Sequence, residues 1–137
     1  MASVEVPRTR RDDAGGSCFD TVTIELESRE FAPPTPAFDV SEPISVERLL
    51  FFSVPAGYVG DWHPSPRDQL YVQMSGALDV TVSSGEHRTL TAGDVLLVTD
   101  TDGIGHQSRV VGSEPSTGCF VQLPESPAGH SDIGGDD

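Results

Sequence analysis

Apolar and polar residues alternate along most of this chain in short runs, and glycine, proline or aspartate separates one run from the next. Alternation with a period of two is typical of strands that bury one face. The pattern predicts strands at 21–27, 48–54, 69–76, 78–82, 88–90, 95–98, 106–112 and 118–124. No stretch has the apolar spacing of an amphipathic helix. The expected fold class is therefore all-β, a sandwich or barrel of short strands.

Both ends of the chain lack this alternation. Residues 1–17 and 124–137 mix proline, glycine and charged residues without periodicity, which predicts a disordered tail at each end. Four prolines in 29–43 exclude a helix and a central strand, so this segment is expected to lie extended along the domain surface. A single domain over 18–123 is the expected organisation, because 137 residues suffice for one core.

The charge balance excludes several classes of partner. The chain has 22 acidic residues against 8 basic ones, all of them arginine, and its net charge is -14. Such a chain repels phosphate backbones and anionic membrane surfaces, so we expect neither nucleic acid nor membrane as a partner. It has no apolar run of bilayer length and no apolar leader, which predicts a cytoplasmic protein. Cys18 and Cys119 lack the spacing of a metal or redox pair and are expected to be free thiols.

A row of polar side chains leads into the strand at 69–76. If the chain stays extended, alternate positions place one set of side chains on the same face: His63, Ser65, Arg67, Gln69, Tyr71 and Gln73. Polar groups inside a small barrel are costly unless they are paired or line a wet pocket. The row therefore predicts a pocket, whereas a register break at the two prolines would leave this face in solvent.

Two spacings of glycine and histidine resemble the motifs of the cupins, which are small double-stranded β-helix barrels. The first cupin motif, G-x5-H-x-H-x3-4-E-x6-G, has its spacing reproduced by Gly57, His63, Ser65, Gln69 and Gly76. The second motif is similar to the stretch from Gly93 to His106, with two extra residues after the glycine. The resemblance covers roughly 45–123, with the motifs in 57–76 and 93–110, and implies a cupin-type jelly-roll barrel.

The cupin resemblance also implies a metal site. Cupins bind Fe, Mn, Ni, Zn or Cu through two histidines and a glutamate of the first motif and a histidine of the second. Carried over to this chain, the metal ligands would be His63, Gln69 and His106. Ser65 and Gln69 stand where cupins have histidine and glutamate, and the missing carboxylate weakens the hold on a dication. Asp61 shares strand parity with His63 and would restore a carboxylate, and a site without metal is the alternative.

The other pocket residues are expected to contact a substrate. The candidate catalytic residues are His63, His106 and Tyr71, and the candidate substrate-binding residues are Trp62, Ser65, Arg67 and Gln73. Arg67 would anchor a carboxylate or phosphate, or else form a rim ion pair with Asp68 or another carboxylate. Tyr71 and Gln73 would alternatively bond one another, and Trp62 would alternatively pack at the barrel mouth.

Three functions are compatible with these residues. The first is binding of a divalent metal and a small anionic or oxygen-rich metabolite, as in an isomerase, lyase, cyclase or dioxygenase. The second is a metal-free binding module without catalysis. The third is acid/base catalysis by His63 or His106 without a metal.

Two further expectations concern the surface. The apolar stripe Leu70, Val72 and Met74 faces outward and needs cover, from the proline-rich segment 31–43 or from a second subunit, which predicts a homodimer. The acidic stretch 100–103 is expected to be a turn because the later ligands of a calcium loop are missing. His87, in a hairpin turn, is expected to be exposed.

Overall fold

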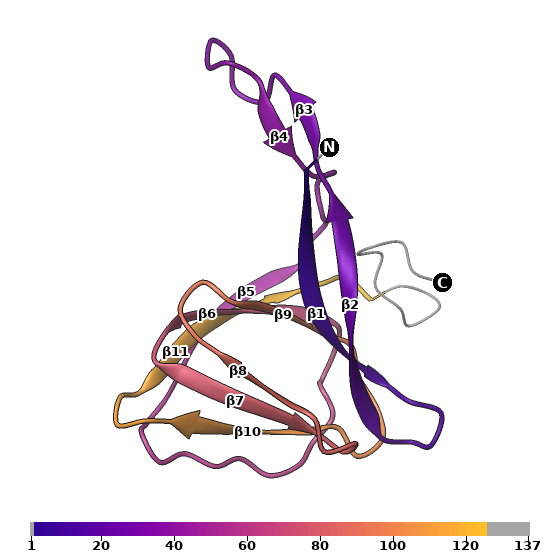
Figure 1. Cartoon of the computed structure of the whole chain (residues 1–137), viewed down its shortest axis with the longest axis vertical. Coiled ribbons are helices and arrows are strands. Elements are labelled where there is room, and N and C mark those ends of the chain that lie inside the picture. Colours follow the sequence, from indigo (N-terminus) through magenta and orange to yellow (C-terminus); the bar gives the residue numbers. More distant parts are fainter. Residues whose placement is uncertain (1, 126–137) are drawn as a thin grey trace.

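Eleven strands and no helix form the described part of the chain, which comprises residues 2–125 of the computed structural model (Figure 1). The strands are β1 (Ser3–Arg11), β2 (Ser17–Glu25), β3 (Glu27–Arg29), β4 (Phe38–Val40), β5 (Arg48–Val54), β6 (Gln69–Ser75), β7 (Ala77–Val82), β8 (His87–Leu90), β9 (Val95–Val98), β10 (His106–Val111) and β11 (Ser116–Gln122). Within these residues, nothing offers the long apolar helix that would cross a membrane.

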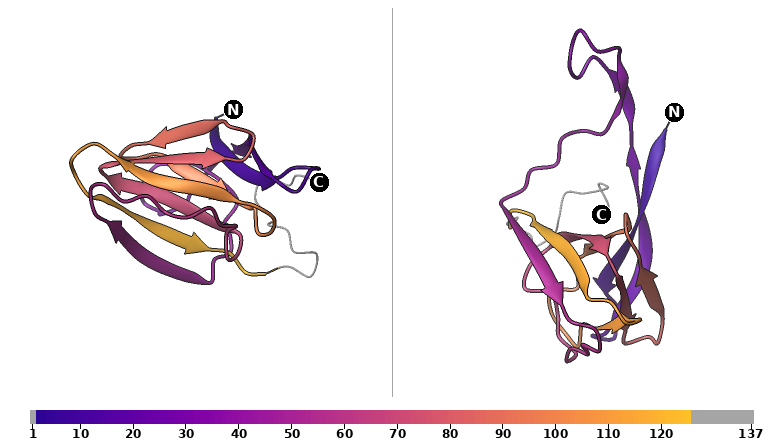
Figure 2. Two further views of the ribbon diagram at one scale, coloured as in Figure 1. Left: turned by 90° about the horizontal axis from the view of Figure 1, so that it is seen from below. Right: turned by 90° about the vertical axis from the view of Figure 1, so that its left-hand side faces the viewer.

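Two sheets face one another and enclose the core (Figure 2). The larger has the strand order β2-β1-β9-β6-β11-β5, and the smaller has the order β10-β7-β8. Neighbouring strands run antiparallel except for β1 and β9, which are parallel. The predicted all-β jelly-roll class is confirmed by this arrangement. The predicted strands 48–54 and 95–98 coincide with β5 and β9.

Strand alternation decides which side chains enter the core. In β7, Leu78, Val80 and Val82 are buried between the sheets. In β9, Leu96 and Val98 join this core, whereas Leu97 lies in a second cluster with Val6 and Val22. The predicted outward stripe of β6 lies on the same side as this second cluster. Its first residue, Leu70, packs there, and Met74 at the far end of β6 is 50% exposed.

The N-terminal segment is not a tail, contrary to the prediction for residues 1–17. Strand β1 lies inside the larger sheet, paired with β2 from Ser3 to Arg11 and with β9 at Arg8 and Thr9. Its arginines obscure the apolar alternation that predicts a strand, and in the fold two of them form hydrogen bonds with a carboxylate. The carboxylate of Asp20 on β2 accepts hydrogen bonds from Arg8 and Arg10.

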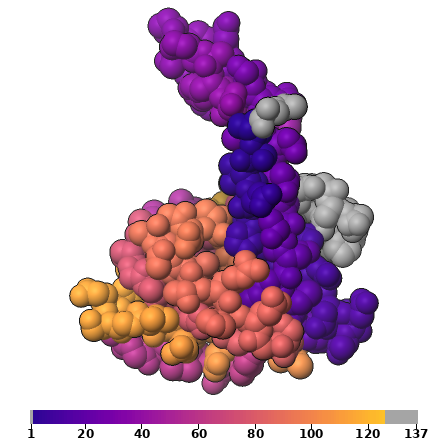
Figure 3. All heavy atoms as spheres, viewed as in Figure 1, coloured from indigo at the N-terminus to yellow at the C-terminus, as the bar shows by residue number. Residues whose placement is uncertain are grey.

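The proline-rich segment also departs from expectation, since it does not lie along the domain surface. Strands β3 and β4 pair antiparallel and form an arm that projects away from the two sheets (Figures 1 and 3). The rings of Phe31 and Phe38 pack against each other there with their centroids 5.6 Å apart. The predicted C-terminal tail lies outside the described residues, apart from 124–125.

Candidate functional site

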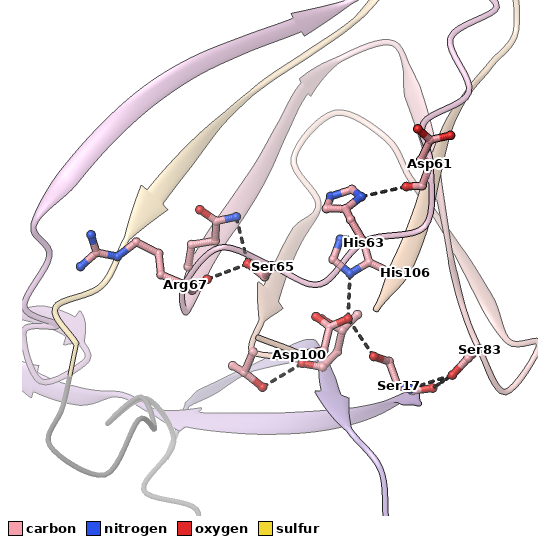
Figure 4. A network of polar contacts seen from close by, with 11 residues as sticks. Ser17, Asp61, His63, Ser65, Arg67, Ser83, Asp100 and His106 are labelled. Carbon is pink, nitrogen blue, oxygen red and sulfur yellow. Dashed lines mark hydrogen bonds and ion pairs between the residues drawn. The ribbon is translucent and has the colours of Figure 1, made fainter. Parts of the chain in front are cut away.

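The two motif histidines are neighbours in space, as the cupin spacing implies. His63 and His106 form an isolated antiparallel bridge in which each backbone N–H donates to the other residue's carbonyl oxygen at 3.0 Å. Their rings lie with centroids 4.9 Å apart and an interplanar angle of 55° (Figure 4). The two imidazoles therefore lie side by side, one from the segment before β6 and one from the start of β10.

This close approach depends on a glycine. Gly105 has a φ of +83°, and a Cβ built there would lie 2.0 Å from the carbonyl oxygen of His63. A side chain at position 105 would have to displace the His63 backbone, since real Cβ atoms do not approach an oxygen so closely. The glycine before the second histidine therefore allows the two histidine backbones to lie this close.

His106 is oriented by a buried carboxylate. Its Nδ1 lies 2.7 Å from Oδ2 of Asp100, which has no exposed surface. Asp100 lies at the start of the acidic stretch 100–103, in the loop between β9 and β10. Because a carboxylate only accepts hydrogen bonds, Nδ1 of His106 carries a proton, and in the neutral ring Nε2 is left as an acceptor.

Asp100 is in turn held by the N-terminal hairpin. The hydroxyl of Thr9 on β1 donates to Oδ1 at 2.8 Å, and the hydroxyl of Ser17 on β2 donates to Oδ2 at 2.9 Å. Burial raises the pKa of Asp100, but the hydrogen bonds from His106, Thr9 and Ser17 outweigh it, so its pKa lies below the ordinary value. Asp100 is therefore an ionised, fully partnered carboxylate behind the imidazole.

His63 has the same tautomer for a different reason. Its Nδ1 lies 2.8 Å from the backbone carbonyl oxygen of Asp61, which accepts the Nδ1 proton (Figure 4). The Nε2 atoms of His63 and His106 are thus both unprotonated when the rings are neutral. Together they offer two acceptors to a hydrogen-bond donor.

The histidines belong to the wall of a cavity of about 320 Å³ between the two sheets. Most of the wall is apolar and comes from Leu50, Phe52, Tyr58, Pro66, Leu78, Val80, Leu96, Val98 and Phe120. Its polar members are His63, Ser65, Gln69, Tyr71, His106, Ser108 and Gln122. No described residue in this wall is an aspartate, glutamate, arginine or lysine. The cavity is an apolar chamber with a few polar groups.

Gln69 takes part in a network of amides rather than facing the cavity with an unused oxygen. Its Nε2 donates to Oγ of Ser65 at 3.3 Å, and its Oε1 accepts from Nε2 of Gln122 at 2.9 Å. Oε1 of Gln122 accepts in turn from Nε of Arg48 at 3.0 Å. A glutamine suits this position because an amide both donates and accepts, which a carboxylate does not.

Four of the predicted site residues offer no free polar group to the cavity: Trp62, Arg67, Tyr71 and Gln73. Arg67 leaves the polar row because Ser65 Oγ donates to its backbone oxygen, and its guanidinium donates to Leu123 O and to Glu47. Gln73 is fully buried but outside the cavity wall. Tyr71 is in the wall, yet its hydroxyl donates to Oε1 of Gln73 at 2.6 Å, in agreement with the alternative interpretation of this pair. Burial raises the pKa of Tyr71 and keeps it protonated.

Trp62 is also outside the cavity wall, with 42% of its surface exposed. His63, Ser65, Gln69, Tyr71 and His106 are the predicted residues that the fold brings together around one cavity. The predicted row of side chains on one face is not continuous through the two prolines, because the strand β6 begins only at Gln69. The expectation for His87 is confirmed, since its side chain is 62% exposed.

The donor set does not fit the metal that the cupin resemblance implies. Among residues 2–125, no group of three or more His, Cys, Asp or Glu side chains is placed to share an ion. His63 and His106 give two imidazole nitrogens, and Asp100 lies behind His106 with both oxygens engaged. Asp61 contributes its backbone oxygen to His63, and Oε1 of Gln69 is occupied by Gln122. Within residues 2–125, a third strong ligand is lacking.

The sequence interpretation missed the residues that orient His106. Asp100 was assigned only to an acidic turn, and Thr9 and Ser17 fell in the predicted tail. The available signal was an aspartate two positions after the buried strand β9 and six positions before His106. The pairing with Thr9, 91 positions away, has no signature in the sequence.

Comparison with known proteins gives matches among solved structures only: no protein-family model matches the sequence, and no curated protein does. A Cupin 2 conserved barrel domain protein from Salinispora arenicola is 22% identical, with 72% of this chain and 76% of that chain covered and a TM-score of 0.48. A conserved protein of unknown function from Streptococcus pyogenes is 24% identical, with a TM-score of 0.43, and the alignment covers 57% of this chain and 65% of that one.

NovW, a 4-keto-6-deoxy sugar epimerase from Streptomyces spheroides, is 18% identical with a TM-score of 0.42, over 89% of this chain and 71% of that chain. The architecture itself carries the conclusion on fold. Two facing sheets enclose a cavity, and the two motif histidines meet in its wall. This chain has a cupin-type fold.

Proposed function

We propose that this protein binds a small, uncharged and mostly apolar molecule in the cavity between its sheets. A hydrogen-bond donor of the ligand, such as a hydroxyl group, is shared by Nε2 of His63 and Nε2 of His106. The observation that supports this is the composition of the cavity wall, in which two imidazole acceptors stand among apolar side chains. A volume of about 320 Å³ suits a compact ligand.

The charge distribution argues against the anionic ligand that the sequence suggested. Arg67, the expected anchor for a carboxylate or phosphate, is engaged by Glu47 and by the carbonyl oxygen of Leu123. The described residues of the wall include no guanidinium, and the chain as a whole is strongly acidic. An anion entering an apolar chamber without a cationic partner loses its hydration and gains little in return.

A matched set of three probes tests this proposal. We suggest three compounds that share a tert-butylphenyl group. 4-tert-Butylphenol carries a hydrogen-bond donor, tert-butylbenzene carries no polar group, and 4-tert-butylbenzoate carries a negative charge. Calorimetry and protein-observed NMR would measure binding. We expect the phenol to bind most tightly and to shift the resonances of His63 and His106. Tighter binding of the benzoate would overturn the uncharged class, and failure of all three to reach the cavity would overturn the site.

Histidine variants separate the polar contact from the apolar one. His106→Asn should weaken binding of the phenol about fivefold, since a hydrogen bond in a buried site contributes on the order of 1 kcal/mol. Binding of tert-butylbenzene should change little. His87→Asn is the matched control, because His87 is exposed and lies outside the cavity wall. Equal weakening of the phenol by both variants would contradict the assigned contact.

The pair His106–Asp100 favours a second function, in which the bound molecule loses a proton. A neutral imidazole accepts the proton at Nε2, and the ionised Asp100 stabilises the imidazolium that forms. The buried carboxylate, held by Thr9 and Ser17, is what supports this role over simple binding. No metal takes part in such a step.

An activated probe tests for the base directly. 5-Nitrobenzisoxazole is small, uncharged and aromatic; a base removes its C3 proton, the N–O bond breaks, and a coloured cyanonitrophenolate forms. We expect the wild-type protein to accelerate this elimination, with a rate that is insensitive to chelators. His106→Asn should lower the rate about a hundredfold. A rate unaffected by this variant would exclude the catalytic role and leave the binding proposal standing.

A further inference from the structure

Strand β5 has an open backbone edge. It is the last strand of the larger sheet and pairs over all seven residues with β11 on one side only (Figure 2). In an antiparallel sheet, alternate residues direct N–H and C=O groups to opposite sides of the strand. Among the described residues, no strand pairs with the groups of β5 that point away from β11.

This edge is also apolar on both faces. Leu49, Leu50 and Phe51 are 57%, 45% and 75% exposed. The one charged residue of β5 is Arg48 at its start, and its Nε is already hydrogen-bonded to Gln122. Soluble proteins normally interrupt such an edge with lysine, proline, a bulge or a short strand. The stretch 49–54 contains none of these residues, and its register with β11 is regular.

Two other sheet edges have the protection that β5 lacks. The opposite edge of the larger sheet is β2, whose exposed positions are the polar residues Thr21, Thr23 and Glu25. The β10 edge of the smaller sheet is flanked by the segment 59–63, which bridges to it at Arg109 and His106. Strand β5 differs from both, because within residues 2–125 its edge has neither polar side chains at its exposed apolar positions nor a neighbouring strand.

We propose that β5 pairs antiparallel with β5 of a second copy of this chain, around a two-fold axis at Phe51. A strand that pairs antiparallel with itself brings each backbone donor opposite an acceptor, which makes the contact closed and symmetric. With this axis, Phe51 faces the partner's Phe51 and Leu49 faces the partner's Ser53. The most exposed apolar side chain then lies at the centre of the interface.

Charge favours a second copy at this place. Two chains of net charge -14 repel each other, so a stable contact needs a surface without acidic residues. The stretch 48–54 has none. In the proposed register, Arg48 lies opposite the partner's Val54, which keeps the two arginines at opposite ends of the interface. This dimer does not depend on the proposed ligand, although Leu50 of the same strand lines the cavity.

The first test is the mass in solution by light scattering at micromolar concentration. We expect the wild-type protein to be a dimer and Phe51→Asp to have half that mass. Met74→Asp is the matched control, since Met74 is 50% exposed on the outward stripe of β6, the competing surface. Circular dichroism confirms that each variant is folded. A monomeric wild type would overturn the proposal, and so would a dimer dissociated by Met74→Asp but not by Phe51→Asp.

The second test reports the register and does not depend on dissociation. Residues that face each other across antiparallel strands have Cβ atoms ~4.5–5.5 Å apart, near the range that a disulfide accepts. Phe51→Cys should therefore form a disulfide-linked dimer under mild oxidation. The two native cysteines, which are free thiols as predicted, are first replaced by alanine because Cys119 pairs with position 51 across β5 and β11. Met74→Cys should stay unlinked, and the reverse result would overturn the pairing.

Discussion

Nδ1 of His106 donates a hydrogen bond to a carboxylate oxygen of Asp100, 2.7 Å away, and Asp100 is completely buried. A second histidine of the chain, His87, has the same relationship to a buried aspartate, Asp79. Nδ1 of His87 lies 2.8 Å from Oδ1 of Asp79. Only the first pair borders the cavity, so the two pairs form an internal comparison.

Asp100→Asn should change the tautomer of His106. An asparagine amide can donate to Nδ1, which moves the imidazole proton to Nε2 and removes the acceptor from the cavity. Long-range proton–nitrogen NMR of the imidazole at neutral pH measures this directly. Asp79→Asn is the control and should alter the signals of His87 but not those of His106. An unprotonated Nε2 on His106 in the Asp100 variant would contradict the orienting role.

Gly105→Ala should destabilise the protein and move His63. Gly85 provides the matched control because it has a φ of +99° and no atom lies within 4 Å of the place a Cβ would take, so Gly85→Ala meets only the left-handed backbone penalty of about 1–2 kcal/mol. The alanine at 105 also meets the His63 carbonyl oxygen, which should add about 1–3 kcal/mol to the loss. Chemical denaturation measures both free energies of unfolding, and equal losses would contradict the contact.

Wild-type protein should not take up a divalent metal in stoichiometric amounts. Two imidazoles without a third strong ligand hold such ions weakly. Gln69→Glu places a carboxylate in the same cavity wall and should bind Zn²⁺ or Ni²⁺ more tightly, despite the loss of the amide contact with Ser65. Equilibrium dialysis of untagged protein followed by elemental analysis measures both. Near-stoichiometric uptake by the wild type, abolished by His106→Asn, would contradict this expectation.

Asp20→Asn should remove an acid-sensitive part of the stability. Hydrogen bonds from Arg8 hold the pKa of Asp20 below the ordinary value of 3.8. A lowered folded pKa contributes stability above the unfolded pKa, and that contribution disappears as the pH falls through the folded pKa. The deficit of the variant should be full at about pH 6 and shrink below about pH 4. Denaturation at both pH values measures it, with Glu114→Gln as a neutralised surface control; a deficit independent of pH would contradict the assignment.

The alternation of apolar and polar residues predicted the strands of the sandwich, because it depends only on neighbouring positions in the chain. The spacing of the two motifs predicted that His63 and His106 lie close together. The interpretation of the polar row failed at Arg67, where the chain turns before the strand begins. Strand β1 was missed because its charges look like those of a tail until Asp20 pairs with them. Asp100 could not be assigned a role because its partners Thr9 and Ser17 are distant in the chain.

The place of β1 between β2 and β9 also determines when the site is completed during synthesis. The hairpin of β1 and β2 can close as soon as it leaves the ribosome, since its strands are adjacent in the chain. The other edge of β1 can pair only after Leu97 and Val98 have been synthesised. The hydroxyl of Thr9 likewise lacks its acceptor until Asp100, 91 positions later, has been added. A nascent chain that stops before β9 therefore holds an uncovered hairpin and no oriented imidazole, and the chemistry of the protein is among the last properties it acquires.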